Sequence, residues 1–237
     1  MEVDILTISA HPDDVEITCA GTIIKMTEAG YRVAILDLTA GESGTRGTPA
    51  LREKEARKAA KVLGVVHREH LDIPDAGVEN NRENKLRVAQ KIRDLKPQTV
   101  ILPYWKGRHP DHYTTGLLGY EACFLAGLAK VPLAGKPHRP FKIIYASLYV
   151  PTVHPSFVVD ITGQFEKKLK AIFCFSSQFS PPKELQNLFP SRGDINEGMR
   201  SEARHFGRLI GVRYGEPFIM RETAAVEDIV KIPVKSI

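Results

Sequence analysis

The chain has 237 residues, of which 43% are apolar, and a formal net charge of +5. This length suits one sizeable α/β domain and is short for two, so we expect one domain over residues 1–237. Basic and acidic residues are interleaved and no nucleic-acid-binding motif is present, which argues against a nucleic-acid partner. A basic site for an anionic substrate explains the modest charge at least as well.

The sequence predicts a cytoplasmic protein. We find no signal peptide and no apolar run long enough to span a bilayer, so we expect no membrane association. Cys19, Cys123 and Cys174 are far apart and form no C-x-x-C motif, which indicates reduced, buried packing residues.

Predicted strands alternate with predicted helices along the chain. Apolar runs indicate strands at residues 3–8, 33–38, 67–73, 99–102, 142–150, 157–160 and 218–221. Helical periodicity and caps indicate helices at 15–28, 48–63, 86–95 and 113–125, one capped by Thr162, and one at 197–210. Residues 130–141 and 176–195 are expected to be irregular. This order predicts a single Rossmann-like α/β domain, with a mainly parallel sheet, helices on both faces and a site at the C-terminal ends of the strands.

Two similar polar clusters follow two of the predicted strands. Ala10-His11-Pro12-Asp13-Asp14 follows the strand at 3–8, and Arg108-His109-Pro110-Asp111-His112 follows the strand at 99–102. Aspartate is a favoured helix cap, so either cluster alone is explained by capping. The recurrence of His-Pro-Asp at the same place in two βα units favours a composite metal site instead. If these strands are neighbours at the switch point of the sheet, both clusters meet in one crevice.

The residue types in these clusters suit metal-assisted hydrolysis. His11, Asp14 and His112 provide two nitrogen ligands and one oxygen ligand, a common set in catalytic zinc sites. Asp13 remains free to accept a proton as general base. His109 is expected to stabilise a developing oxyanion, with Asp111 orienting and charging it.

Other interpretations of the same residues stay open. The ligand set also occurs in non-haem iron oxygenases, so ligand type does not settle the metal. A non-catalytic metal- or sugar-binding module is a third class, although it would not need a free Asp13 or a His109–Asp111 pair. The glycine-rich stretch 39–47 lacks both the P-loop and the dinucleotide fingerprint, and we interpret it as a rim of the active-site mouth. Arg52, just beyond it, either points into that mouth or lies on the surface.

The chain resembles the PIG-L/LmbE-like zinc-dependent deacetylases, which remove acetyl groups from N-acetylglucosaminyl compounds. The motifs that match are AHPDD at 10–14, HPDH at 109–112, the segments 41–48 and 210–218, and Leu51-Arg52 with the helix that follows. Together they look most like the bacillithiol-pathway branch, which deacetylates N-acetylglucosaminyl-malate. Substrates of the chitobiose or mycothiol-precursor type are the alternative.

The resemblance implies one LmbE-like deacetylase domain that holds one zinc ion, acts on a small N-acetylglucosaminyl substrate and forms a homo-oligomer, with hexamers in related members. It implies that His11, Asp14 and His112 bind zinc. Asp13 would be the general base, and His109 would help to stabilise the tetrahedral intermediate. It also implies that Arg52 contacts the substrate and that Arg108 lines the same mouth, which Arg46 flanks as well. The segments 130–141 and 176–195 are where specificity would vary.

Overall fold

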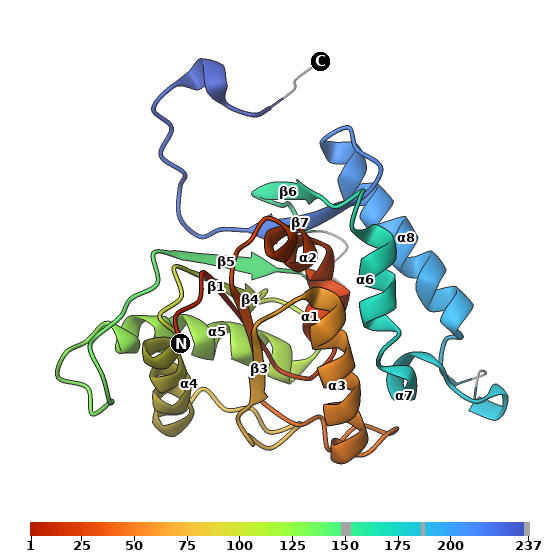
Figure 1. The fold of residues 1–237 in the computed structure, drawn as a ribbon, viewed down its shortest axis with the longest axis horizontal. Coiled ribbons are helices and arrows are strands. Elements are labelled where there is room, and N and C mark those ends of the chain that lie inside the picture. The colour runs from red at the N-terminus through yellow and green to blue at the C-terminus, as the bar shows by residue number, and fades with distance from the viewer. Residues whose placement is uncertain (148–152, 186–187, 235–237) are drawn as a thin grey trace.

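A seven-stranded sheet forms the centre of the molecule (Figure 1). The computed structural model describes residues 1–147, 153–185 and 188–234. The strands are β1 (Ile5–Ser9), β2 (Val33–Asp37), β3 (His67–His70), β4 (Thr99–Pro103), β5 (Lys142–Ala146), β6 (Phe157–Asp160) and β7 (Gly215–Ile219). Their order is β3-β2-β1-β4-β5-β7-β6, with β1 to β5 parallel and β7 antiparallel to both β5 and β6. The predicted, mainly parallel α/β fold is confirmed.

Helices cover both faces of this sheet. They are α1 (Asp14–Thr18), α2 (Ala20–Glu28), α3 (Pro49–Leu63), α4 (Arg82–Leu95), α5 (Pro110–Ala126), α6 (Phe165–Ile172), α7 (Ser176–Phe179) and α8 (Arg192–Leu209), with 3-10 turns η1 (Lys183–Leu185) and η2 (Ile229–Lys231). In the described part of the chain, no helix is long and apolar enough to cross a membrane.

Alternate residues of β1 pack into two different cores. Leu6 and Ile8 join a buried cluster with side chains of α4 and α5 on one face. Ile5 joins a second cluster with side chains of α1, α2, α3 and α6 on the other face. Both faces of the central strands are therefore buried, which explains why these strands are almost continuously apolar in the sequence.

The site depends on the pairing of β1 with β4. Residues Ile5 to Thr7 of β1 lie in register with Thr99 to Ile101 of β4, while β2 and β3 extend the sheet from the other edge of β1. The strand order reverses between β1 and β4, and the two polar clusters follow these two strands. The predicted switch point is confirmed, and it brings the clusters together.

The first predicted helix is divided in two. Cys19 has φ −139° and separates α1 from α2, so the expected continuous helix at 15–28 is wrong at this residue. The carboxylate of Glu216 on β7 accepts hydrogen bonds from the backbone N–H groups of Gly21 and Thr22, at 2.9 and 2.6 Å. A carboxylate from a distant strand thus satisfies donors that a new helix start leaves free, which no local pattern in the sequence predicts.

Smaller differences concern element ends. The strand expected at 67–73 ends at His70, and the helix expected at 113–125 already begins at Pro110. Thr162 does not cap α6, because its hydroxyl accepts from the N–H of Tyr214 at 3.3 Å instead. The segment 176–195 includes α7, η1 and the start of α8, and the strand expected at 142–150 reaches into residues 148–152, which lie outside the described ones. Cys19 and Cys123 are buried as expected, but Cys174 is half-buried.

Candidate metal centre and active site

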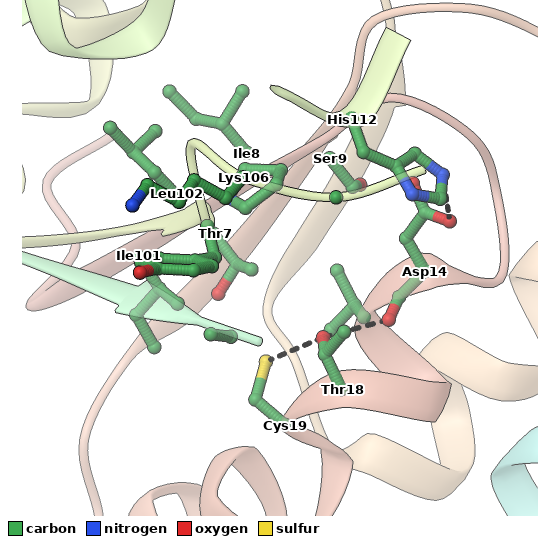
Figure 2. Close-up of a pocket in the computed structure, with 15 residues that line it drawn as sticks. Thr7, Ile8, Ser9, Asp14, Thr18, Cys19, Ile101, Leu102, Lys106 and His112 are labelled. Atoms are coloured by element: carbon green, nitrogen blue, oxygen red, sulfur yellow. Dashed lines mark hydrogen bonds and ion pairs between the residues drawn. The ribbon is translucent and has the colours of Figure 1, made fainter. Parts of the chain in front are cut away.

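Three predicted ligands converge at the carboxyl ends of β1 and β4. Nε2 of His112 lies 3.2 Å from Nδ1 of His11 and 3.1 Å from Oδ1 of Asp14, and Nδ1 of His11 lies 3.5 Å from Oδ2 of Asp14. Ligand atoms about 2.0–2.1 Å from a tetrahedral metal ion are roughly 3.3 Å apart, so these spacings fit one ion. Figure 2 shows His112 and Asp14 facing each other. The arrangement is a candidate metal site made of the three residues that the sequence predicted.

The charges around the cluster favour a cation. Although burial favours the neutral acid, His112 and His11 hold the pKa of Asp14 well below its usual range. Burial lowers the pKa of His11, but Asp14 and Asp75 outweigh it and raise that pKa to about 11. A site that draws a proton so strongly is also suited to a metal cation, which would replace the proton.

His11 is held from behind by two further carboxylates. Its Nε2 lies 3.0 Å from Oδ1 of Asp75 and 3.3 Å from Oδ2 of Asp111. In the neutral ring that binds a metal, the N–H at Nε2 would donate to these carboxylates, and the lone pair of Nδ1 would then face Asp14 and His112. Asp75 was not among the residues predicted from the sequence. Its position in a Pro-Asp turn after β3, at the same edge of the sheet, was the available signal.

Asp111 contacts a different histidine from the expected one. We expected its carboxylate to orient and charge His109, but it accepts hydrogen bonds from the N–H groups of Ala76 and Val78 and from His11. The reason is that Asp111 lies in the first turn of α5, which directs its side chain toward the loop after β3. The hydrogen bond to His109 comes from the backbone N–H of Asp111, which donates to Nδ1 at 3.3 Å. Burial lowers the pKa of His109, and the charge of the Asp111 carboxylate opposes this, so the expected charging effect is present although the orienting contact is not.

The position of His109 leaves its outer nitrogen available as a donor. Because Nδ1 accepts from the N–H of Asp111, the ring proton of the neutral form is at Nε2. Burial and then the charges of His112 and His11 lower the pKa of His109. The ring stacks on that of His112, with centroids 4.7 Å apart, so it borders the metal ligands.

Asp13 is beside the ligands but is not one of the three. It occupies the N-cap position of α1 with φ 143°, a rare backbone conformation for a residue other than glycine, and its side chain makes no capping hydrogen bond. Its Oδ2 lies 3.0 Å from Nη2 of Arg52. Burial raises the pKa of Asp13 to about 7, and the charge of Arg52 opposes that rise. The capping interpretation of Asp13 is therefore wrong, and its carboxyl is suited to exchange protons near neutral pH.

The three arginines predicted at the mouth have different surroundings. Arg52 is buried and donates to the carbonyl of Pro12 at 2.6 Å besides pairing with Asp13. Arg46 is half-buried, donates to the carbonyl of Gln178, and lies over the ring of Phe189 at 4.3 Å. Arg108 is exposed in the segment just before His109. Arg52 therefore contacts the cluster through the carboxylate of Asp13 and the backbone of Pro12.

Three candidate metal ligands, a largely buried carboxyl and a neighbouring donor lie together here, an arrangement that suits a metal-dependent hydrolase. Residues 6–123 match the family model described as PIG-L: GlcNAc-PI de-N-acetylase. A diacetylchitobiose deacetylase from Thermococcus kodakarensis is 34% identical over 90% of this chain and 80% of its own length. The chain belongs to the PIG-L family and is an N-acetyl sugar deacetylase by class.

Two other proteins extend the comparison. A probable N-acetyl-alpha-D-glucosaminyl L-malate deacetylase 2 from Bacillus anthracis is 31% identical over 76% of this chain and 83% of its own length. The crystal structure of the conserved protein TT1542 from Thermus thermophilus superposes with a TM-score of 0.86 and 36% identity, covering 95% of this chain and 98% of that one. The bacillithiol type of enzyme is thus among the relatives, as the sequence motifs indicated.

Proposed function

We propose that the protein removes the acetyl group from an N-acetylglucosaminyl conjugate with the help of one zinc ion. The observation that carries this proposal is that Asp13 lies beside three candidate metal ligands. Its carboxyl neither caps the N-terminus of α1 nor belongs to the ligand set. A site that only bound metal would not need this strained neighbour, whose side chain is 13% exposed.

The residues divide the chemistry between them. His11, Asp14 and His112 would hold a divalent metal ion, which when bound would supply Lewis-acid polarisation of the amide carbonyl. Asp13 accepts the proton of the attacking water, and Arg52 orients its carboxylate and opposes the rise in its pKa that burial causes. His109 offers its Nε2 proton to the developing oxyanion. Water adds to the carbonyl carbon, the C–N bond breaks, and the products are acetate and the free amine.

The aglycone has two candidates. Our sequence-based interpretation favours N-acetylglucosaminyl-malate, since arginine binds carboxylates well, and the Bacillus anthracis relative supports it. Diacetylchitobiose is the second candidate, because the relative from Thermococcus kodakarensis matches more of the chain. Arg52 is buried and paired with Asp13, so it is less available to a carboxylate on the aglycone than its sequence position suggested. The homo-oligomer, the hexamer and the cytoplasmic location remain predictions.

One assay tests the function and separates the substrates. Protein loaded with zinc and protein stripped of metal are each given N-acetylglucosaminyl-malate, N,N′-diacetylchitobiose and N-acetylglucosamine, and release of acetate and amine is measured. We expect metal-dependent hydrolysis, with the malate conjugate having the highest kcat/KM. If diacetylchitobiose is the better substrate, the second candidate is correct. If none of the three is hydrolysed by the zinc-loaded protein, the proposal is wrong.

A further inference from the structure

A small cavity begins at the candidate metal ligands and is lined by residues of β1, α1 and β4 and of the loop after β4 (Figure 2). Asp14 and His112 line one end of it, and Val15, Cys19 and Ile101 are among the side chains that form its wall. These three wall residues are almost completely buried. The cavity volume is about 30 Å3, which is on the order of one or two water molecules or a short organic group. Such a space cannot accept a sugar ring.

One wall residue has an unusual polar atom. Thr7, in the middle of β1, is 3% exposed, and its Oγ1 has no hydrogen-bond partner among the described residues. A buried hydroxyl without a partner is costly, so an atom that fills this cavity and hydrogen-bonds to Thr7 would bind better than an apolar one. Figure 2 shows Thr7 among the side chains that surround the cavity, together with Cys19 and Ile101.

The position of the cavity matches one part of the substrate. In the proposed reaction the amide carbonyl lies at His11, Asp14 and His112, so the carbon attached to that carbonyl lies within one or two bonds of the ligands. The sugar must be on the open side, because the cavity is too small for it. The remaining substituent of the carbonyl carbon is the alkyl part of the acyl group. This part then enters the cavity, where it contacts Val15 and Ile101.

We infer that this cavity is the acyl pocket and that it sets acyl specificity. It admits acetyl and groups one non-hydrogen atom longer, and it excludes longer chains. Because of Thr7 Oγ1, it favours a hydroxyacetyl (glycolyl) group over a propionyl group of nearly the same size. Hydrolysis of the longer amides follows the same balance, with water consumed and glycolate or propionate released with the amine. This inference rests on the proposed function and adds the acyl class to it.

The first test exchanges the hydroxyl of Thr7 for a methyl group. Rates are compared for N-acetyl, N-glycolyl, N-propionyl and N-butyryl forms of one glucosamine conjugate. In the unmodified protein we expect glycolyl to exceed propionyl and butyryl to be hydrolysed at least about tenfold more slowly than acetyl. Thr7→Val should shift the glycolyl-to-propionyl ratio of kcat/KM toward propionyl by roughly two- to tenfold, the value of one neutral hydrogen bond. Thr115→Val is the matched control, since its buried hydroxyl also has no partner among the described residues but lies outside the cavity.

The second test enlarges the cavity. Cys19→Ala removes a sulfur atom from the wall and should raise the propionyl-to-acetyl and butyryl-to-acetyl ratios of kcat/KM. Cys123→Ala is the matched control, because Cys123 is also buried but packs in the core on the side of α4 and α5. Metal content is measured for all four variants, so that a change in ratio is not attributed to a change in loading.

The outcomes separate this inference from the proposed function. If acetyl amides are hydrolysed but Thr7→Val and Cys19→Ala leave the acyl ratios as they are in the two controls, the acyl pocket is wrong and the deacetylase activity stands. If no amide is hydrolysed, the proposed function is wrong, and the pocket is judged by ligand-observed NMR binding of N-glycolyl- and N-propionyl-glucosamine to the zinc-loaded protein. If the ratio of the affinities for N-glycolyl- and N-propionyl-glucosamine is the same in the unmodified protein and in Thr7→Val, the acyl-pocket inference is wrong as well.

Discussion

Arg52 and Asp13 form an ion pair at the edge of the metal cluster, with Nη2 and Oδ2 3.0 Å apart and side chains 6% and 13% exposed. Arg52 comes from the first turn of α3, and Asp13 comes from the turn after β1. The same guanidinium donates to the carbonyl of Pro12. The Arg52 guanidinium therefore fixes both the backbone and the carboxylate of this strained turn. It holds the Asp13 carboxylate in the position from which it would accept a proton.

Replacing Asp13 should separate proton transfer from metal binding. Asp13→Asn should keep the metal and the fold and lower kcat by about 10²–10⁴-fold, because an amide cannot serve as general base. Asp14→Asn should instead release metal, since it removes one of three ligands. Metal content by elemental analysis and kcat are measured for both variants. If Asp13→Asn loses more metal than Asp14→Asn, then Asp13 is the ligand and Asp14 the base.

Replacing Arg52 distinguishes two roles for this residue. Because it contacts Asp13 and Pro12, Arg52→Ala should lower kcat to a similar extent for the malate conjugate and for N-acetylglucosamine, with zinc retained. If Arg52 bound the aglycone, as the family resemblance implied, the loss would be confined to the malate conjugate. Steady-state kinetics on both substrates decide the matter, and a selective rise in KM for the malate conjugate would contradict the positioning role.

The fold and the convergence of the three candidate ligands were predictable because local patterns encode them. Apolar runs buried on both faces identify β1 and β4, and His-Pro-Asp after each strand identifies the two clusters. Parallel strands place such clusters at one edge of the sheet, so the ligands meet once β1 pairs with β4. The candidate metal site follows from short-range sequence features together with one strand pairing.

The contacts that hold those ligands in place were not predictable in the same way. Asp75 is far from His11 in the sequence, and its turn resembles any other Pro-Asp turn. Asp111 was assigned to His109 because they are neighbours in sequence, whereas the first turn of α5 directs its carboxylate to His11. The break at Cys19 depends on Glu216 from β7. Each of these features depends on side-chain direction or on a distant element, and neither is visible in hydrophobic periodicity.

Removing the carboxylate of Asp75 should weaken metal binding without removing a ligand. Its hydrogen bond with His11 lowers the pKa of Asp75 to about 2, so it is ionised at neutral pH and orients the ring. Asp75→Asn should raise the Kd for zinc about 10–100-fold, the usual cost of losing such a partner of a ligating histidine. Competition with a chelator measures the Kd. Asp72→Asn is the control, because Asp72 is exposed and pairs with His70 instead, and an equal effect in both variants would show that Asp75 does not act through His11.

The buried ion pair between Lys168 and Glu216 should matter for stability rather than for catalysis. Nζ of Lys168 lies 2.7 Å from Oε1 of Glu216, and their side chains are 6% and 2% exposed. Glu216 also accepts from Gly21 and Thr22, so it connects β7 to α2 and α6. Glu216→Ala would leave a buried ammonium and two helix N–H groups without this partner, at a cost of about 3–5 kcal/mol.

An exposed ion pair provides the comparison for that loss. Glu28 pairs with Lys167 at 3.0 Å, and both side chains are more than 40% exposed, so Glu28→Ala should cost at most about 1 kcal/mol. Urea unfolding of the two variants and the unmodified protein gives both differences in the free energy of unfolding. We expect the Glu216 variant to unfold at clearly lower urea while its folded fraction retains zinc, because none of the three ligands contacts Glu216. Equal midpoints for the two variants would mean that the buried pair contributes no more to stability than the surface pair.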